Sequence, residues 1–448
     1  MSTSRTDASL RFSSLEDWLG WLETLHPRKI DLGLGRVKKV LLAMGLERPP
    51  YRIITIGGTN GKGSCVAMLE SIYRRAGYRV GAFTSPHLWR FNERVRVDGE
   101  EASDEELITI FRAINAARGD VTLSYFEYSA VTAIAKFAHE GVQIALLEVG
   151  LGGRLDAVNA LDPDASMIVS IDLDHQAWLG DTRDAVALEK AGILRRARPA
   201  IIADRDPPAA LLEYAQSLGC ALHLLGRDFD YELPPDGGWR YQAAAWKSPT
   251  LPVPPFGGRV QLGNVAACVA AVQSLRAELP VAEAALAGGI ERARLPARLD
   301  RRLVDDVEWI FDVAHNPAAA RILADELASC AKCSRTIAVF AAMADKDVAG
   351  VVDPLIPIVD EWIVTRADSE RGASESTVMG VLTELHANSV TAHPVVAEAC
   401  HYARSLAASG DRVLVFGSFY MVGPAMTALE LYCAPSPPDD RSSRWIGA

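Results

Sequence analysis

Short apolar runs of strand length alternate with segments of helical periodicity along most of the sequence. Such alternation predicts an α/β fold with a mainly parallel, doubly wound sheet, which binds ligands at the carboxyl ends of its strands. The first series of predicted buried strands comprises residues 51–56, 79–84, 144–150, 166–171 and 199–203. A second series comprises residues 308–314, 336–343, 361–367 and 412–419. Two separate series predict a large first α/β domain and a smaller second one.

The expected domain limits follow from the segments around the second series. LPARLD at residues 295–300 marks the expected boundary. We therefore predict a first domain over residues 1–297 and a C-terminal α/β domain over residues 298–433. The remaining residues, 434–448, are rich in Pro, Ser and Asp and are predicted to form a disordered tail.

Two further segments have patterns of their own. SLEDWLGWLETL at residues 14–25 predicts an amphipathic helix with Ser14 as its cap. The segment 233–258 is rich in Pro, Gly and Trp and lacks a helical period, so we interpret it as an irregular hairpin or insert.

Composition narrows the possible partners. The 448 residues include 46 Lys and Arg against 57 Asp and Glu, a net charge of -11, so we expect neither nucleic acid nor an anionic membrane as a partner. The seven scattered cysteines predict free thiols in a reducing compartment, with Cys330 and Cys333 as ordinary thiols on a helix. The N-terminus lacks a basic start followed by an apolar run, and no apolar stretch has membrane-spanning length. A cytoplasmic protein is expected.

The loop GGTNGKGS at residues 57–64 follows a predicted strand and precedes a predicted helix. Its glycines allow backbone N–H groups and a helix N-terminus to surround an anion, while Lys62 reaches outer phosphates and Ser64 approaches a magnesium ion. The usual phosphate loop has its hydroxyl residue directly after the lysine, whereas Gly63 stands there in this sequence. A plain glycine-rich turn is the alternative, but strand, loop and helix in succession favour a nucleotide site.

Several motifs in order along the chain resemble those of one enzyme family. They are GTNGKGS, TSPHLWRFNERVRV, LEVGLGGRLDAVN, SIDLDHQAWLGDT, EKAGI, FDVAHNP and GSFY. This set resembles the folylpolyglutamate synthases and dihydrofolate synthases, the folate branch of the Mur ligase superfamily, over residues 18–426. The resemblance implies a ligase that uses ATP to activate a carboxylate as an acyl phosphate. It implies addition of L-glutamate to 7,8-dihydropteroate and to reduced folates by a monomer.

The resemblance also implies a nucleotide site and a metal site. The implied nucleotide-binding residues are Thr59, Asn60, Gly61, Lys62, Gly63, Ser64, Asn264, Arg298 and Asp312. Two magnesium ions are implied, and their protein ligands are Ser85, Glu148 and His175. Each of these three follows a predicted strand, so they can meet at one edge of the sheet. His175 as a structural hydrogen-bonding residue and Asp312 as a helix cap remain open alternatives.

The implied catalytic residues are Lys62, Lys190 and His315. In the family the lysine matching Lys190 is carbamylated by carbon dioxide, which turns a cation into a metal ligand. Composition alone predicts an ordinary surface lysine on a helix at this position. Lys346, at a comparable strand end in the second domain, is placed near the reaction centre.

The resemblance also implies a folate-binding site, formed by the segments that contact the pterin in bifunctional members of the family. The implied residues are Thr24, Leu25, His26, Ser124, Tyr125, Phe126, Glu127, Leu155, Asp156 and Ala157. An aromatic slot with a carboxylate suits a flat pterin, whereas a packing cluster is the alternative. A folylpolyglutamate synthase alone, another Mur-type ligase, or a nucleotide switch without ligation are the other hypotheses.

Overall fold

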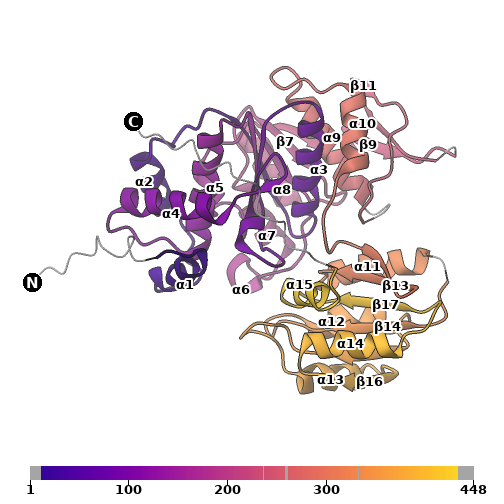
Figure 1. Cartoon of the computed structure of the whole chain (residues 1–448). Helices are drawn as coiled ribbons and strands as arrows, with labels where there is room; N and C mark the ends of the chain where they lie inside the picture. The colour runs from indigo at the N-terminus through magenta and orange to yellow at the C-terminus, as the bar shows by residue number, and fades with distance from the viewer. Residues whose placement is uncertain (1–11, 236, 258–260, 331, 432–448) are drawn as a thin grey trace, which may run out of the picture.

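The computed structural model describes residues 12–235, 237–257, 261–330 and 332–431, which form two α/β units (Figure 1). The first unit is built on an eight-stranded sheet. Its strands, in spatial order, are β4 (Glu100–Glu101), β3 (Val95–Val97), β2 (Val80–Phe83), β5 (Ile144–Glu148), β1 (Arg52–Gly57), β6 (Ala165–Ile168), β7 (Pro199–Ile202) and β8 (Ala221–Leu224). The pairing is parallel except at one edge, where β3 runs antiparallel to β2 and β4.

Helices cover both faces of this sheet. One face packs against α3 (Lys62–Arg75), α9 (Leu262–Ser274) and α10 (Glu283–Arg292). The other packs against α1 (Leu15–Leu25), α2 (Gly35–Ala43), α4 (Asp104–Arg118), α5 (Tyr125–Glu140), α7 (Arg183–Ala191) and α8 (Ala209–Leu218). Short turns of helix lie in the connecting loops: η2 (Phe91–Arg94), η3 (Ala157–Ala160) and α6 (Gln176–Leu179). This double cover explains why the central strands are apolar on both faces.

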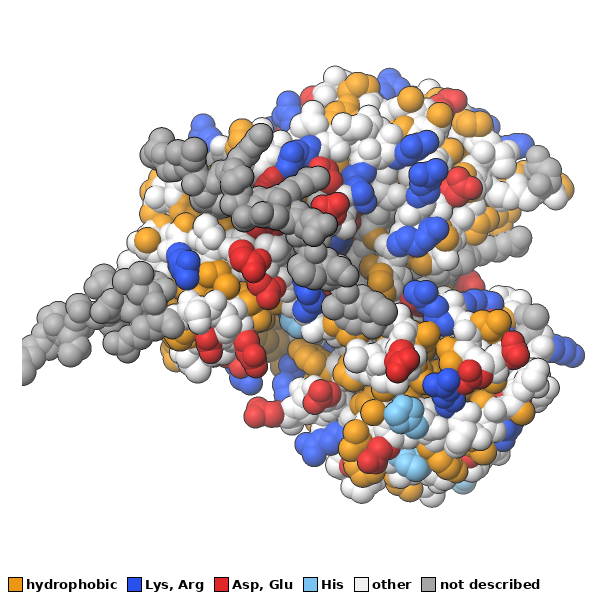
Figure 2. Space-filling view, viewed as in Figure 1, with side chains coloured by type: hydrophobic (Ala, Val, Ile, Leu, Met, Phe, Trp, Pro, Cys, Tyr) orange, Lys and Arg blue, Asp and Glu red, His pale blue; other side chains and the backbone are white. Residues whose placement is uncertain are grey.

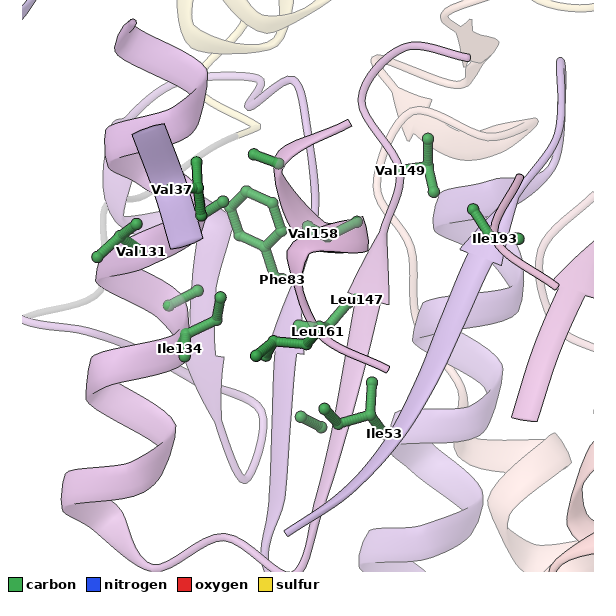
Figure 3. Packing of buried hydrophobic residues seen from close by; sticks show 14 of the residues in the cluster. Val37, Ile53, Phe83, Val131, Ile134, Leu147, Val149, Val158, Leu161 and Ile193 are labelled. Atoms are coloured by element: carbon green, nitrogen blue, oxygen red, sulfur yellow. The ribbon is translucent and has the colours of Figure 1, made fainter. Parts of the chain in front are cut away.

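The core of the first unit joins the sheet to the helices that carry the expected folate residues. Phe83 of β2 and Leu147 of β5 belong to the same packed cluster as Val131 and Ile134 of α5 (Figure 3). All four side chains are fully buried. Burial on this scale fixes α5, and with it the segment at its N-terminus, against the sheet.

The second unit has a six-stranded sheet. Its strands, in spatial order, are β12 (Asp300–Val304), β13 (Val307–Asp312), β17 (Arg412–Phe416), β14 (Thr336–Phe340), β15 (Glu361–Val364) and β16 (Ser389–Ala392). Only β12 is antiparallel to its neighbour among these described strands. One face packs against α14 (Val396–Leu406) and α15 (Phe419–Ala428), and the other against α11 (Pro317–Ser329), α12 (Val348–Val352), η5 (Asp353–Leu355) and α13 (Glu375–Glu384).

A small antiparallel sheet accompanies the first unit. It comprises β9 (Phe229–Glu232), β10 (Arg240–Ala243) and β11 (Trp246–Lys247). The hairpin of β10 and β11 lies in the segment interpreted from sequence as an irregular hairpin or insert. Phe229 and Tyr241 join the core that includes α9, so this sheet packs against that helix.

All nine predicted strands are present, and Ser14 caps α1 by accepting a hydrogen bond from the Asp17 N–H at 3.2 Å. One prediction was wrong. Cys330 is the residue that ends α11 and Cys333 lies beyond it, so this pair of thiols does not lie on a helix. The predicted tail at 434–448 and most of the N-terminal segment lie outside the described residues.

On the face shown in Figure 2, Lys and Arg side chains are interspersed with Asp and Glu side chains. In the part of the chain that the structure describes, helices are too short or too polar to span a membrane.

Candidate active site

A cavity of about 420 Å³ lies where the carboxyl ends of the first sheet's strands face the second unit. The segments that follow β1, β2, β5 and β6 form one wall. The N-terminus of α5 forms another. The second unit contributes Arg298, His315, Met343, Lys346, Arg371, Ser418, Phe419 and Tyr420. Strand ends that are distant in sequence therefore meet at one site, as doubly wound folds require.

The glycine loop leads from β1 into α3 and lines the cavity from Gly58 to Gly63. Gly61 has a φ of 88°, a left-handed conformation that favours glycine. A Cβ at this position would lie 2.8 Å from Asn264 Nδ2 and 2.9 Å from Val169 Cγ1. The loop therefore needs glycine for its backbone angle and for its close contact with α9. Asn264 lies next to Gly61 on the side of the loop away from the cavity, and it does not line the cavity.

The Lys62 side chain folds back onto the glycine loop that carries it. Its Nζ donates hydrogen bonds to the carbonyl oxygens of Gly58 at 3.1 Å and Thr59 at 3.2 Å. Burial lowers the pKa of this lysine, and the nearby Glu148 carboxylate opposes the shift. The ammonium group lines the cavity and is positioned for an anion above the loop.

Ser64 and Glu148 form a site suited to a hard cation. Ser64 is buried, and its Oγ has no hydrogen-bond partner among the described residues. Glu148 is also buried, and its Oε2 accepts a hydrogen bond from the Ser85 N–H at 3.1 Å. Burial raises the pKa of Glu148, and the charge of Lys62 opposes the shift. A cation at this place would satisfy both the carboxylate and the unpartnered hydroxyl.

The chemistry of these donors fits magnesium better than a transition metal. The described residues contain no group of three His, Cys, Asp or Glu side chains arranged to hold a metal ion. Magnesium is commonly held by one or two carboxylates together with phosphate oxygens and water. Ser85 and His175 line the same cavity as Glu148. The three residues expected as metal ligands therefore share one site.

His175 stands at the start of α6 with a φ of 52°. A left-handed conformation at a non-glycine residue is uncommon and is a feature of functional sites. Its Nε2 lies 4.0 Å from Asp174 Oδ2, and burial lowers the pKa of the imidazole, so the neutral form is favoured. A neutral imidazole has the lone pair that a metal ligand needs.

Lys190 is not the surface lysine that composition predicts. It lies on α7, is buried, lines the cavity, and has no hydrogen bond or ion pair to another described residue. Burial lowers its pKa to about 7, with a further contribution from the charge of Lys62. A large fraction of this amine is therefore uncharged at neutral pH, which is the form that reacts with carbon dioxide.

Polar contacts between the two units centre on Asp174. Its Oδ1 accepts a hydrogen bond from Lys346 Nζ at 2.6 Å, and its Oδ2 accepts one from Asn316 Nδ2 at 3.4 Å. Asn316 also exchanges two hydrogen bonds with Asn60 of the glycine loop, at 3.0 and 3.1 Å. Burial alone would raise the pKa of Asp174, but the neighbouring His175 and Lys346 side chains outweigh burial and lower it. The second unit is thereby held directly over the glycine loop.

His315 lines the cavity next to these contacts. Its Nδ1 lies 2.8 Å from the Val313 carbonyl oxygen, which fixes the proton on Nδ1 and leaves Nε2 free to accept one. Burial lowers the pKa of His315 to about 4, with a contribution from the charge of Lys346. The imidazole is therefore neutral near pH 7, with an unprotonated Nε2.

Arg298 and Asp312 lie at the junction of the units. Arg298 lines the cavity, and its guanidinium stacks over the ring of Phe419 at 5.7 Å. Asp312 is buried and accepts hydrogen bonds from the Leu299 N–H at 2.8 Å and the Ala314 N–H at 2.7 Å. It is not a helix cap, because Asn316 caps α11. Asp312 fixes the backbone beside Arg298 and is not among the cavity-lining residues.

The expected folate residues differ in their positions. Ser124, Tyr125, Phe126 and Glu127 at the start of α5, and Leu155, Asp156 and Ala157 after β5, line the cavity. The Asp156 carboxylate accepts hydrogen bonds from the N–H groups of Gly150, Leu151 and Val158, and burial raises its pKa to about 7.

The carboxylate of Glu127 is already engaged. It accepts hydrogen bonds from the Ser124 N–H at 2.8 Å and from Arg36 Nε at 3.0 Å. Arg36 also pairs with Asp31, which in turn lies 3.1 Å from His26 Nε2. The cavity lining does not include Thr24, Leu25 or His26, which lie at the end of α1. His26 is linked to the cavity through its contact with Asp31, which does line it.

Several cavity residues were not singled out from the sequence, and four of them carry polar groups that can meet a ligand. They are Arg94, Asp174, Arg371 and Tyr420. Three of them belong to quoted motifs or lie next to a predicted ligand: Arg94 within TSPHLWRFNERVRV, Asp174 beside His175, and Tyr420 within GSFY. Arg371 had no sequence signal, since it lies in a loop of the second unit.

The family model "Mur ligase, glutamate ligase domain" matches residues 297–419. The dihydrofolate synthase/folylpolyglutamate synthase of Escherichia coli (strain K12) is 38% identical over 418 residues, which cover 93% of this chain and 96% of that protein. The structure of E. coli FolC in complex with DHPP and ADP has a TM-score of 0.88 at 38% identity and covers 96% of this chain and 99% of that one.

A third comparison adds a complex with three ligands. A bifunctional folylpolyglutamate synthase/dihydrofolate synthase with Mn, AMPPNP and L-glutamate bound has a TM-score of 0.86 at 38% identity, over 96% of this chain and 100% of that one. Similarity of this extent covers both units. The chain belongs to the dihydrofolate synthase/folylpolyglutamate synthase family of Mur ligases.

Proposed function

We propose that this chain, an ATP-dependent glutamate ligase, adds L-glutamate to both 7,8-dihydropteroate and reduced folates through an acyl phosphate. The proposal rests on one observation: a single cavity contains the phosphate loop, the side chains of Ser85, Glu148 and His175, and an aromatic wall. A carboxylate acceptor on the aromatic wall can therefore meet the terminal phosphate of a nucleotide on the loop. Relatives in solved complexes bind DHPP, ADP, AMPPNP and L-glutamate.

The nucleotide would lie along the glycine loop. Backbone N–H groups from Gly61 to Ser64, together with Lys62, would bind the phosphates. The N–H groups of Thr59 and Asn60 instead donate to the carbonyl oxygen and the Oγ of Ser170, at 2.8 and 2.9 Å, and so fix the start of the loop. Arg298 would bind phosphate from the second unit, and Asp312 would fix the adjoining backbone. Asn264, on the far side of the loop, would lie toward the adenine. The contact of Gly61 with Asn264 supports this arrangement.

Ser64, Ser85, Glu148 and His175 would hold magnesium, and a carbamate on Lys190 would complete a second ion's ligands. Magnesium held there would supply positive charge beside the phosphates. The buried, unpaired Lys190 with a pKa of about 7 supports the carbamate, because that modification supplies an anion where the unmodified lysine would be a costly buried cation.

His315 would accept the proton from the ammonium group of L-glutamate. The hydrogen bond of Nδ1 to the Val313 carbonyl oxygen leaves Nε2 with a free lone pair, which supports this assignment. The free amine then attacks the acyl carbon, the amide bond forms, and inorganic phosphate leaves. Lys346, held by Asp174, would offset the negative charge that develops on the phosphate.

Tyr125 and Phe126 would stack against the pterin, with Asp156 as the carboxyl group beside it. Leu155 and Ala157 would complete this wall. Phe126 packs tightly on Gly150, where a Cβ would lie 2.5 Å from the ring, so this aromatic side chain has a fixed position. A fixed aromatic wall supports binding of a flat ring system.

The remaining assignments concern the molecule as a whole. We propose a monomer with a first domain over residues 1–297, a second over 298–433, and a cytoplasmic location. The six described cysteines are free thiols, which supports a reducing compartment.

The test is phosphate release with ATP, magnesium, bicarbonate and L-glutamate. It is run with dihydropteroate, with tetrahydrofolate, and with neither. Turnover with both acceptors supports the bifunctional assignment, whereas turnover with tetrahydrofolate alone reduces it to a folylpolyglutamate synthase. Absence of acceptor-dependent release from the folded protein contradicts the proposed function.

A further inference from the structure

Arg94 is a buried cation in the wall of the cavity. It has no role among the nucleotide, metal and pterin residues assigned above. It ends the η2 turn, and only 8% of its surface is exposed. Its guanidinium stacks over Tyr125 at 5.5 Å and over Phe91 at 5.8 Å. Its Nε donates a hydrogen bond to His87 Nδ1 at 2.9 Å. The orientation of the group is therefore fixed by three neighbours.

The two terminal nitrogens of Arg94 have no acceptor among the described residues. No described carboxylate pairs with this guanidinium either. His87 does not offset the charge, because its Nδ1 accepts the hydrogen bond from Arg94 Nε and therefore carries no proton. Glu93 and Glu148 act on this charge from a distance, but neither forms an ion pair with it. A buried guanidinium without a direct partner is costly, so its position suits an anionic ligand.

Arg96, two residues further along, shows how the same side chain behaves in a structural role. It pairs with Glu70 at 2.9 Å and also donates to Thr84 Oγ1 at 3.1 Å and to the Glu93 carbonyl oxygen at 2.9 Å. Its hydrogen-bonding groups are thus satisfied inside the protein. Arg94 differs because its free donors belong to a residue that lines the cavity.

The location of Arg94 identifies which anion it meets. Tyr125 belongs to the aromatic wall, and Glu148 belongs to the cation site near the glycine loop. Tyr125, Tyr420 and Glu148 all lie close enough to act on the charge of Arg94. Arg94 therefore stands between the proposed pterin and the proposed phosphates. An acceptor folate bound there would have its reacting carboxylate between these two sites.

We propose that Arg94 binds the carboxylate of the acceptor and holds it for phosphorylation. This inference rests on the proposed function, because it deepens the assignment of that site. One carboxylate oxygen attacks the γ-phosphorus, the new O–P bond forms, and the bond to ADP breaks. Arg94 stays protonated throughout and binds the other oxygen. Two charged hydrogen bonds of this kind supply both affinity and orientation.

The test compares two ligands that differ only in the carboxylate. One is 7,8-dihydropteroate, and the other is the same dihydropterin with an aniline in place of 4-aminobenzoate. Binding is measured by calorimetry with AMPPNP and magnesium present. Arg94→Met should weaken dihydropteroate binding by roughly 10- to 100-fold and leave binding of the aniline ligand unchanged. Arg94→Lys should retain part of the affinity, because it keeps the charge but loses the planar pair of donors.

Arg154→Met is the matched control, since Arg154 is exposed and pairs with Glu189 outside the cavity. It should leave binding of both ligands unchanged. Equal weakening of both ligands by Arg94→Met and Arg94→Lys, or no weakening of either, would overturn the inference. Failure of the proposed function is a separate result, seen as the lack of acceptor-dependent turnover by the unaltered protein.

Discussion

Gly423→Ala is a substitution that tests whether the docking of the two units supports activity. Gly423 lies inside α15 of the second unit and is buried. A Cβ there would lie 2.2 Å from the Leu88 carbonyl oxygen, which belongs to the loop after β2. The indole N–H of Trp89 donates to the Gly423 carbonyl oxygen at 2.9 Å. Leu88 and Trp89 also pack against the core of the second unit.

The expected cost follows from these contacts. The added methyl group must separate the two backbones by about 1 Å to reach an ordinary van der Waals distance. Overpacking of this kind costs about 1–3 kcal/mol, and loss of the Trp89 hydrogen bond costs about 0.5–1.5 kcal/mol. The higher helix propensity of alanine offsets about 0.5–1 kcal/mol. A net cost of about 1–3 kcal/mol disfavours the docked arrangement.

Because the same loop carries Ser85, separation of the units should displace the proposed metal site from His315 and Lys346. We therefore expect kcat/KM for acceptor-dependent phosphate release to fall roughly 5- to 100-fold. Initial rates and thermal unfolding are measured together. The fold of each unit should persist, because the contact lies between them.

Gly380→Ala is the matched control for this substitution. Gly380 lies in α13 of the same unit, and a Cβ there would have no atom within 4 Å. The control should keep its activity and gain slightly in stability. If Gly423→Ala retains a rate within about twofold of the control, the docking contact does not matter for activity and the reasoning is refuted.

Three further predictions concern the cavity. Gly61→Ala should abolish detectable binding of ATP in calorimetry while circular dichroism stays native, because its Cβ would lie within 3 Å of two neighbouring atoms. Protein depleted of carbon dioxide should regain activity when bicarbonate is added, and more completely as pH rises through about 7, where Lys190 loses its proton, whereas Lys190→Met should show no response. Lys346→Met leaves the Asp174 carboxylate without its 2.6 Å partner, so kcat should fall about 10- to 100-fold. Unchanged kcat in stopped-flow turnover would contradict that role.

The expected cavity residues differ in how far the sequence could place them. Lys62, Glu148 and His175 follow strands, and parallel strands end at one edge of a sheet, so periodicity was enough to bring them together. Composition predicted an exposed Lys190, and this was wrong. A helix that mixes charged and apolar residues does not reveal that its lysine faces inward. Only the packing of α7 against the sheet buries it.

Glu127 and Asp312 show a second limit of sequence reasoning. Each carboxylate is at an expected position, yet Arg36 and Ser124 engage Glu127, and the backbone of Leu299 and Ala314 engages Asp312. A hydrogen-bonding partner far along the chain leaves no local pattern. The sequence therefore indicated which polar groups matter but not which remained free for a ligand.

The sequence by itself determined the order of strands and helices, the glycine loop and the family, because these depend on local periodicity, backbone conformation and contiguous motifs. The tertiary structure alone decided the contacts between the units. Asn60 and Asn316 are 256 residues apart and exchange two hydrogen bonds, and Asp174 meets Lys346 over 172 residues. The same is true of Arg94, whose free guanidinium is recognised only when every neighbour that could have paired with it has been placed. Long-range packing determines which charges are satisfied, and the charges left unsatisfied identify where the substrates bind.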